Sequence, residues 1–275
     1  MLHLFFACSP DDVDEPVPVA TSGEFTLLTY NVAGLPEGLS HSHPEANTPQ
    51  ISPLLNDYDL VLAQEDFWYH NELAANTTHP HQSDPMWDTP AADKMGDGLN
   101  RFSSFAFGDL TRVQWVACNG FTDCASDCLA TKGFSMALTT LAGETAVDVY
   151  NLHAEAGSCE ADIDARNAGL EQFVDAIASH SPEQALIVAG DTNLHSDKAY
   201  DSVPLENLLS KVGLTDACRD LECGDERIDR VMFRNSPSLT LTPLEWSIPP
   251  EFVDAEGNDL SDHEPVAVRF HWAVP

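Results

Sequence analysis

The sequence has few basic residues. Its 275 residues include 12 Lys and Arg against 45 Asp and Glu, which gives a formal net charge of −33 at pH 7. Proteins that bind nucleic acid without sequence preference depend on Lys and Arg to displace counterions from the phosphates. The charge balance therefore argues against a dedicated DNA- or RNA-binding module. The same acidity can equally reflect a salty or cold habitat, and that interpretation assigns no function.

Long hydrophobic runs are also absent. No segment approaches the roughly 20 apolar residues that cross a bilayer, so the sequence predicts no transmembrane helix. Residues 4–8 (LFFAC) resemble the end of a bacterial lipoprotein signal, in which a small residue precedes a lipidated cysteine, here Cys8. Residues 9–23 are acidic and rich in proline, a composition that favours a solvated tether. An irregular buried terminus is the alternative.

We therefore predict a signal remnant and tether over residues 1–23 and a single domain over residues 24–275. Single α/β units often reach about 200 to 250 residues, so the length does not require a second domain. The expected location is outside the cytoplasm, either secreted or lipid-anchored in a bacterial envelope. Nothing in the sequence points to an obligate protein partner.

The cysteines other than Cys8 are even in number: Cys118, Cys124, Cys128, Cys159, Cys218 and Cys223. The C-x2-C spacing of common zinc sites is missing, and no histidine lies between the first three, so disulfides are favoured over zinc. Cys218 and Cys223 are close enough to close a short loop, while the cluster from Cys118 to Cys128 is expected to pair within itself and with Cys159. Disulfides indicate an oxidising compartment.

Internal repeats and heptads are absent, and what recurs is a short apolar run that ends in a polar residue. The length and the β-branched or aromatic content of these runs predict strands. The runs are Phe25–Val32, Asp59–Gln64, Ala146–His153, Ala185–Gly190, Ile228–Phe233 and Val266–His271. Several are apolar on both faces, as in strands that are covered on both sides.

Helical signals lie between these strands. Apolar residues recur at helical spacing over Asp162–Ser179, and weaker patterns fit Thr48–Asn56 and Tyr200–Val212. Residues 75–100 are rich in Pro, Asp and Asn and read as a long surface loop, a common place for specificity elements. Strands with interspersed helices predict an α/β sandwich of two sheets with the helices outside.

Polar residues gather where the strands end. Side chains alternate across a strand, so Asp191 and Asn193 leave the sheet on the same side. Hard oxygen ligands suit Mg²⁺ or Ca²⁺, and histidine transfers protons near neutral pH. The oxygen ligands are Asn31, Glu65, Asp191 and Asp262. Together these groups predict a phosphoester hydrolase, although each one alone also fits a turn, a helix cap or a solvated strand edge.

The order of the motifs resembles the endonuclease/exonuclease/phosphatase superfamily typified by deoxyribonuclease I. The matching segments are Leu28–Asn31 (LTYN), Ala63–Glu65 (AQE), Tyr150–His153 (YNLH), Gly190–Asn193 (GDTN), Arg227–Asp229 (RID) and Leu260–Pro265 (LSDHEP). The resemblance covers about residues 24–272. It implies a four-layered α/β sandwich, with two mixed β-sheets packed face to face, helices outside and the site at one edge of the sheets. It also implies phosphoester hydrolysis with a divalent metal, Mg²⁺ first, with Mn²⁺ or Ca²⁺ as alternatives.

The resemblance assigns the metal to three residues. Glu65 would be the principal ligand, with Asn31 beside it and Asp262 on the same ion or on a neighbouring one. Whether the site holds one metal or two stays open.

The resemblance also assigns the chemistry. Asp191 and Asn193 would hold the attacking water and the phosphate. His263 would be the general base or a phosphate contact, oriented by Asp229 as a carboxylate orients a catalytic imidazole. His153 would stabilise the phosphate or protonate the leaving oxygen.

Two further segments resemble bacterial sphingomyelinases. Residues Asp127–Gly133 (DCLATKG) look like the stretch before a central strand, where Lys132 could contact a phosphate; a surface lysine beside a turn glycine is the alternative. Residues Leu244–Phe252 (LEWSIPPEF) stand where those enzymes carry an apolar docking hairpin. An exposed Trp246, Ile248 and Phe252 would form it, and a satellite cluster under a loop is the alternative.

These features leave three hypotheses. The first is an exported phospholipase C or sphingomyelinase that cleaves a phospholipid or sphingolipid at a head group such as phosphocholine, in some cases at a membrane surface. The second is an extracellular nuclease, which the charge disfavours. The third is a catalytically silent binding protein on the same fold, which the intact motifs disfavour.

Overall fold

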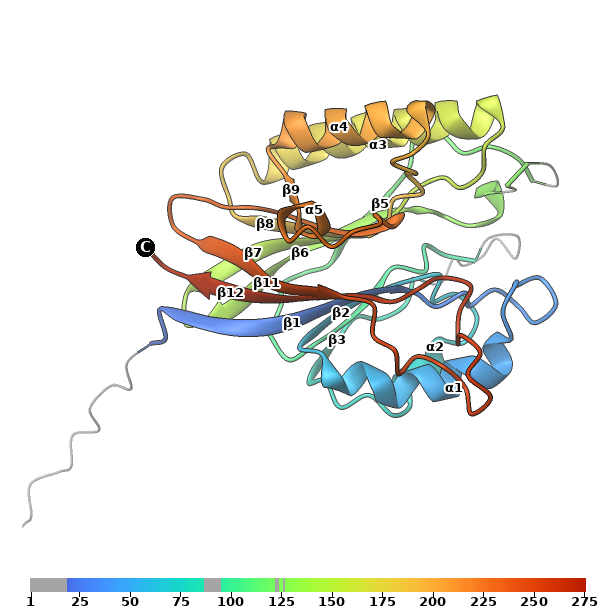
Figure 1. Ribbon diagram of the computed structural model, residues 1–275, viewed down its shortest axis with the longest axis horizontal. Helices are drawn as coiled ribbons and strands as arrows, with labels where there is room; N and C mark the ends of the chain where they lie inside the picture. The colour runs from blue at the N-terminus through green and yellow to red at the C-terminus, as the bar shows by residue number, and fades with distance from the viewer. Residues whose placement is uncertain (1–18, 87–94, 122–123, 126) are drawn as a thin grey trace, which may run out of the picture.

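The structure is a computed structural model that describes residues 19–86, 95–121, 124–125 and 127–275. The lipidation predicted at Cys8, and the tether as far as residue 18, lie outside the described residues. Two mixed, six-stranded sheets pack face to face between two outer layers of helices (Figure 1). The predicted four-layered α/β sandwich is thus confirmed.

The first sheet has the strand order β11-β12-β1-β2-β4-β3. Its strands are β1 (Ser22–Asn31), β2 (Leu60–Gln64), β3 (His81–Gln82), β4 (Asn100–Ser103), β11 (Thr240–Ser247) and β12 (Val266–Ala273). Strands β1 and β2 are parallel, and the other pairs are antiparallel. Helices α1 (Pro44–Leu54) and α2 (His70–Ala74), with a 3₁₀ turn at Leu55–Asp57, lie on its outer face (Figure 1).

The second sheet repeats this plan with the order β5-β6-β7-β8-β10-β9. Its strands are β5 (Thr111–Gln114), β6 (Gly133–Ala142), β7 (Thr145–His153), β8 (Leu186–Asp191), β9 (Thr215–Asp216) and β10 (Asp229–Arg234). Strands β7 and β8 form its parallel pair. Helices α3 (Glu160–His180) and α4 (Ala199–Val212) cover its outer face, a 3₁₀ turn spans Asp127–Leu129, and the short α5 (Ala217–Asp220) precedes β10 (Figure 1).

Three apolar clusters hold the layers together. The central cluster lies between the sheets and includes Leu27, Leu62 and Val149, all 0% exposed. A second cluster joins the second sheet to α3 and α4, and a third joins the first sheet to α1. Because both faces of each sheet are covered, the central strands are apolar on both sides, which explains their continuous hydrophobic runs.

The two parallel pairs bring polar residues to one edge of the sandwich. Asn31 ends β1 beside Gln64 on β2, and His153 ends β7 beside Asp191 on β8. The buried Gln64 side chain crosses between the sheets and donates a 2.7 Å hydrogen bond to the side chain of Asn151. This contact ties the two strand ends together at the level of the polar edge.

The predicted elements are largely confirmed. Each predicted strand is present, and the predicted helices appear as α1, α3 and α4, with α1 beginning four residues before the expected Thr48. The pattern at residues 75–100 predicts only loop, and the structure adds the short β3 there. Strand β11 is not among the predicted strands, because Leu244–Phe252 resembles a hairpin for docking to lipid.

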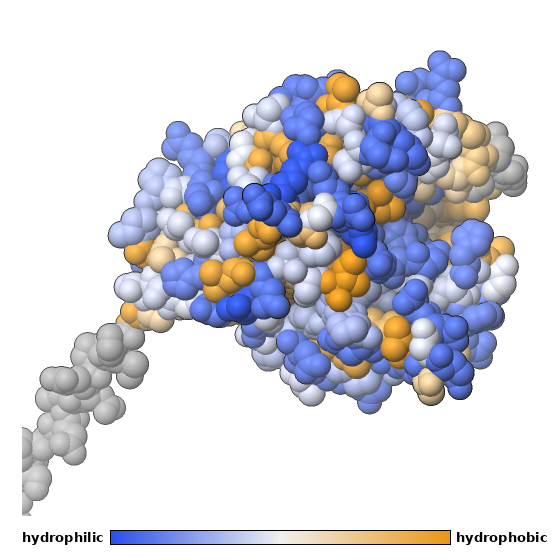
Figure 2. Space-filling model, in the orientation of Figure 1, coloured by the Kyte–Doolittle hydropathy of each residue, from blue (hydrophilic) through white to orange (hydrophobic). Residues whose placement is uncertain are grey.

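No helix among the described residues is long and apolar enough to span a membrane. Figure 2 shows hydrophilic side chains over most of one face of the molecule, with apolar side chains in small separate groups. This distribution agrees with the net charge of −33.

Candidate active site

The site is built on strand ends whose backbone is unusual. Gly190 has φ 141°, and the carbonyl oxygen of Leu152 lies 2.0 Å from the place where a Cβ would stand, so only glycine fits before Asp191. Glu65 and Asn193 adopt the left-handed region with φ 54° and 49°, which is uncommon for residues with a side chain. Strained positions of this kind cluster at functional sites.

Asn31 joins two carboxylates of the site, the partly buried Glu65 and the buried Asp191. Its side-chain amide donates to Glu65 Oε1 and to Asp191 Oδ2, each at 3.2 Å, and its carbonyl oxygen accepts from the backbone N–H of Ala33. Asn31 is 0% exposed. It therefore fixes the spacing of two carboxylates, of which Glu65 follows a strand of the first sheet and Asp191 ends a strand of the second.

His153 lies against the same carboxylates. Its Nε2 is 3.3 Å from Asp191 Oδ2 and 3.8 Å from Glu65 Oε1, and the residue is 1% exposed. Burial, and then the positive charge of Lys132, lower the pKa of His153 well below its usual value. The ring is therefore neutral near pH 7 and carries one N–H donor.

His263 has the opposite electrostatics. Its Nδ1 lies 2.7 Å from Asp229 Oδ2, so the structure brings the predicted pair into contact. Burial acts to lower the pKa of His263, but the hydrogen bond with Asp229 and the charges of Asp229 and Asp191 outweigh it and raise the pKa to about 10. The ring is protonated at neutral pH with these carboxylates alone, and a cation beside Asp191 would act in the opposite direction.

The donor set fits a divalent cation. Burial raises the pKa of Glu65, and burial followed by the charge of Asp229 raises the pKa of Asp191 to about 6. Ligand atoms of Asp191, Asp229 and His263 lie within 4.8 Å of one another. A hard cation stabilises the ionised form of carboxylates, and it does so most where burial and neighbouring acids make ionisation costly. Asp262 is exposed on the wall of the adjoining pocket.

Lys132 enters the site from the segment before β6. It is 7% exposed, and its Nζ is 2.8 Å from Asp127 Oδ1. It lines a pocket of about 550 Å³ together with Glu65 and Asp262. Burial acts to lower the pKa of Lys132, but Asp127 and Glu65 raise it, so the amine is charged. The alternative of a surface lysine is wrong, and the phosphate contact stays a prediction.

The prediction of an exposed apolar docking hairpin at Leu244–Phe252 is wrong. Phe252 is 2% exposed and packs edge-on against Tyr30 with ring centroids 5.1 Å apart. Trp246 is half-buried in strand β11, opposite Val268, and packs on the cluster between the sheets. Ile248 is also half-buried. Strand β11 completes the edge of the first sheet, so its Trp246 serves the core, while Leu244 is 38% exposed.

Three disulfides confirm the cysteine predictions: Cys118–Cys128, Cys124–Cys159 and Cys218–Cys223. The first two hold the loop before Lys132 and join it to the start of α3, and they leave these cysteines unavailable to zinc. Asp127 in that loop also accepts a hydrogen bond from the backbone of Ala156. The disulfides therefore support the wall of the pocket.

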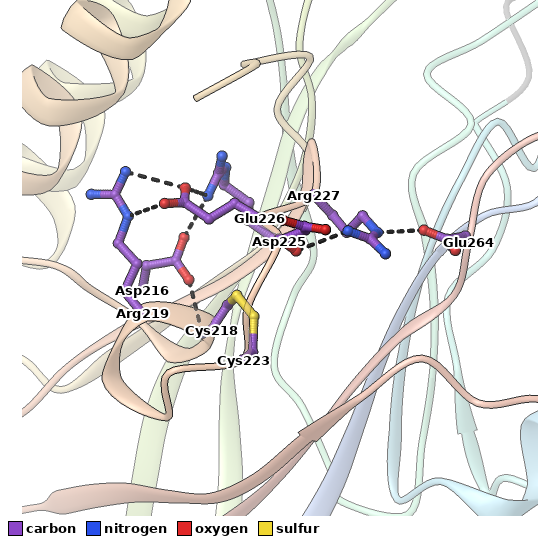
Figure 3. Close-up of a disulfide and its surroundings, with 9 residues drawn as sticks. Asp216, Cys218, Arg219, Cys223, Asp225, Glu226, Arg227 and Glu264 are labelled. Carbon is purple, nitrogen blue, oxygen red and sulfur yellow. Dashed lines mark hydrogen bonds and ion pairs between the residues drawn. A yellow bond between two sulfur atoms is a disulfide. The ribbon is translucent and has the colours of Figure 1, made fainter. Parts of the chain in front are cut away.

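The third disulfide supports the segment that precedes Asp229 (Figure 3). Arg219 and Arg230 both pair with Glu226 in this segment. Arg227 pairs with Glu264, the residue after His263 in the chain that leads to the first sheet. The Arg227–Glu264 ion pair thus links the segment before Asp229 to the segment after His263. This link helps to orient the Asp229 and His263 side chains.

Two acidic residues of this region, Glu155 and Asp127, are not among the site residues predicted from the sequence. Glu155 is 1% exposed, and burial followed by the charge of Asp127 raises its pKa to about 7. Asp127 holds Lys132 in place. Glu155 neither ends an apolar run nor belongs to a matching motif, and Asp127 begins the DCLATKG segment without any sign of its contact with Lys132, so only the fold reveals what the two acids do.

Comparisons with known proteins agree with this geometry. The chain is 34% identical over 277 residues to a sphingomyelinase of Mycobacterium tuberculosis, a match that covers 92% of this chain and 54% of the relative. The chain therefore resembles sphingomyelinases in sequence over most of its length. It spans about half the length of the curated relatives that it matches. No family model matches the sequence.

Solved structures share the fold. A beta toxin variant from Staphylococcus aureus with bound magnesium ions is 15% identical, with a TM-score of 0.65 over 90% of this chain and 99% of the toxin. TDP2 from D. rerio in complex with a single-stranded DNA product is 16% identical, with a TM-score of 0.65 over 90% of this chain and 98% of that one. These similarities establish the deoxyribonuclease I-like fold and confirm the resemblance seen in the sequence, but one fold serves several substrates.

Proposed function

We propose that this chain is a divalent-metal-dependent phosphodiester hydrolase of the phospholipase C or sphingomyelinase type. The observation that carries the proposal is the cluster of Glu65, Asp191, His153 and the Asp229–His263 pair beside a pocket that holds a charged lysine. The similarity to sphingomyelinases supports the choice of a lipid phosphodiester.

Glu65, with Asn31 beside it, and Asp262 would hold Mg²⁺, with Mn²⁺ or Ca²⁺ as alternatives. Such an ion offsets phosphate charge and lowers the pKa of bound water. Asp191, held by the Asn31 amide, would help to hold the attacking water and the phosphate. The chain's own groups do the remaining work. Oriented by Asp229, His263 would either take the proton of the attacking water or donate to a phosphate oxygen.

Three other side chains surround the reacting phosphate in this proposal. Asn193, whose backbone N–H donates a 2.9 Å hydrogen bond to Asp191 Oδ1, would help to fix the water and the phosphate. His153 would donate its single N–H to the phosphate or to the leaving oxygen. Lys132 would add a positive charge from the pocket side, where an ammonium stabilises negative charge best because the surroundings are dry.

The charge distribution favours a zwitterionic lipid over a nucleic acid. A nucleic acid needs cations along several phosphates, and the described pocket lining contains one, Lys132. A nuclease remains the second candidate because TDP2, a protein of the same fold, was solved with DNA.

The deciding experiment measures phosphocholine release from sphingomyelin beside nicking of plasmid DNA, each with Mg²⁺ and with a chelator. We expect release from the lipid that stops with chelator, and little nicking. Plasmid cleavage without lipid hydrolysis would favour the nuclease, and inactivity on both would favour a silent binding protein. Glu65→Gln serves as the matched inactive control.

We further propose that the protein acts at a membrane surface after export. The pocket that contains Glu65 and Lys132 is also lined by Leu39 and Leu129, which are 68% and 39% exposed. Burying a fully exposed leucine contributes about 2 kcal/mol; these two are partly buried already and contribute part of that each, which still favours docking on a neutral bilayer without positive charge. Export is supported by the three disulfides.

The rim is tested with Leu39→Ser and Leu129→Ser. Activity on phosphatidylcholine–sphingomyelin vesicles should fall about 10-fold or more, while activity on a soluble phosphodiester should persist. Trp246→Ala is the control, since a residue of the core should affect both substrates alike. Equal losses in the leucine variants would remove the rim from the proposal.

A further inference from the structure

Asp66, the residue after Glu65, is anchored by a buried polar network. It is 3% exposed, and its Oδ2 lies 2.6 Å from His70 Nδ1 and accepts a 2.7 Å hydrogen bond from the side-chain amide of Asn100. Its backbone N–H donates to the carbonyl oxygen of Gly98 at 3.1 Å. Both the side chain and the backbone of Asp66 are therefore held, although Asp66 has no part in the proposed reaction.

Arg112 holds the other end of this network. It lies in β5 of the second sheet and reaches the start of β4 in the first, where it donates to both carboxylate oxygens of Asp97 at 2.6 and 2.7 Å. It also donates to the carbonyl oxygen of Leu99 at 2.7 Å and to the side-chain oxygen of Asn100 at 2.9 Å. The planar fork of an arginine can make these contacts together, whereas the single ammonium of a lysine cannot. Asn100 thus accepts from Arg112 and donates to Asp66.

The segment that Arg112 fixes lies directly against Glu65. Gly98 has φ 63°, and a Cβ on it would stand 3.1 Å from Glu65 Cα and 2.6 Å from the ring of Phe67. The carbonyl oxygen of Glu65 accepts from the backbone N–H groups of Gly34 and Phe67, at 3.0 and 2.8 Å. The turn that carries Glu65 is therefore enclosed by neighbouring backbone on the side of Gly98 and on the side of Gly34.

Glu65 needs such support because its backbone is in the left-handed region, with φ 54°. This region costs free energy for a residue that has a Cβ, and a strained conformation persists only where the surrounding structure over-determines it. A return to an ordinary φ would turn the side chain away from Asn31, whose amide now donates to Glu65 Oε1 at 3.2 Å. The position of the carboxylate therefore depends on what holds the turn.

We propose that Asp66, Asn100 and Arg112 are positioning residues that hold Glu65 in its ion-binding conformation and thereby set the affinity of the site for Mg²⁺. This inference rests on the proposed function, because it takes Glu65 as a ligand of the ion. The network acts on the turn at Glu65 and not on the Asp229–His263 pair. Its loss should therefore weaken ion binding, while turnover at saturating Mg²⁺ changes much less.

The first test changes the central link of the network. Asn100→Asp keeps the shape of the side chain and the acceptor that faces Arg112, but it places a carboxylate against Asp66 in place of an N–H donor. Calorimetric titration of the full chain with Mg²⁺ alone should show about 10- to 100-fold weaker binding, as for other groups that orient metal ligands. Unchanged affinity would overturn the proposal.

A reciprocal exchange tests the same link by rescue. Asn100→Asp combined with Asp66→Asn again places an N–H donor opposite an acceptor, keeps the total charge and leaves an acceptor for Arg112. The double variant should recover most of the Mg²⁺ affinity that Asn100→Asp loses. A double variant that binds Mg²⁺ as weakly as Asn100→Asp would contradict the proposed link.

The second test separates positioning from stability. Arg112→Lys keeps the charge but removes the fork. Arg234→Lys is the matched control, because Arg234 also donates to carbonyl oxygens, those of Gln184 and Val212, but ends β10 at the opposite end from Asp229. Thermal unfolding should show a lower melting temperature for both variants. Only Arg112→Lys should weaken Mg²⁺ binding, by about 10-fold or more, and the same loss in both variants would mean that the network is merely structural.

The unchanged protein separates this inference from the proposed function. If it neither binds Mg²⁺ nor releases phosphocholine from sphingomyelin, the proposed function fails and the inference fails with it. If it does both, and Asn100→Asp and Arg112→Lys bind Mg²⁺ as the unchanged protein does, the inference alone is overturned.

Discussion

Two regions between the same two sheets have opposite electrostatic needs. At the edge, Glu65, Asp191 and Asp229 bring carboxylates together, and burial raises the pKa of the first two. Deeper in the sandwich, Arg101 of β4 presents donors with no described acid nearby. The edge opens on the pocket that Glu65 lines, whereas Arg101 is buried between the sheets, where an unpaired charge is costly. The difference teaches that acidic side chains crowd at the edge, whereas the interior holds a cation that no described acid neutralises.

The largest effect is expected when a carboxylate charge at the edge is removed. Glu65→Gln keeps the shape of the side chain, so the fold should persist while turnover falls roughly 10²- to 10³-fold or more. Calorimetric titration should show weaker Mg²⁺ binding, and a chelator should have the same effect on the unchanged protein. Wild-type turnover at saturating Mg²⁺ would remove Glu65 from the site.

The next largest effect is expected from replacing the two histidines of the edge. His263→Ala and His153→Ala should each lower the rate about 10²- to 10⁴-fold. Asp229→Asn should cost less, about 10- to 100-fold, as for other carboxylates that orient a histidine. Steady-state kinetics with Mg²⁺ measure all three, and circular dichroism checks the fold. A harmless Asp229→Asn would show that the 2.7 Å contact has no catalytic role.

Reduction of the disulfides tests how much they stabilise the segments around the edge. Reduction should lower the free energy of unfolding by about 2 to 4 kcal/mol per bridge. Mass spectrometry of the unreduced protein should find no free thiol among the six paired cysteines. Alkylation of these cysteines in native protein would contradict both the pairing and the argument for export.

The smallest effect is expected from Glu155, whose raised pKa should make the stability of the fold depend on pH. Its pKa is about 7 in the folded chain, against an ordinary value of 4.5 for a solvated glutamate. Between these values the folded state keeps a proton that the unfolded chain has released, so stability falls as the pH rises from about 4.5 to 7. Glu155→Gln should remove this penalty and gain about 2 kcal/mol at pH 8 relative to pH 4.5.

Urea unfolding of both proteins across this pH range measures the difference. Asp164→Asn is a control, because this α3 carboxylate is exposed to solvent. Parallel curves for Glu155→Gln and wild type would mean that Glu155 ionises normally.

The sequence by itself determined the central strands and the residues of the edge. Asn31, Glu65, His153 and Asp191 each end or follow an apolar run, and it is the order of their motifs, shared with the deoxyribonuclease I-like superfamily, that singled them out. The pairing of Cys218 with Cys223 followed from their short separation in the same way.

Only the tertiary structure decided which side chains are buried and how they are charged. The segment from Trp246 to Phe252 has the apolar content of a docking hairpin, yet it packs on the core because β11 pairs with β12. Arg101 stands in a strand whose sequence does not reveal that no described acid reaches it. Burial and pKa depend on neighbours from distant segments, and a local pattern carries no information about those neighbours.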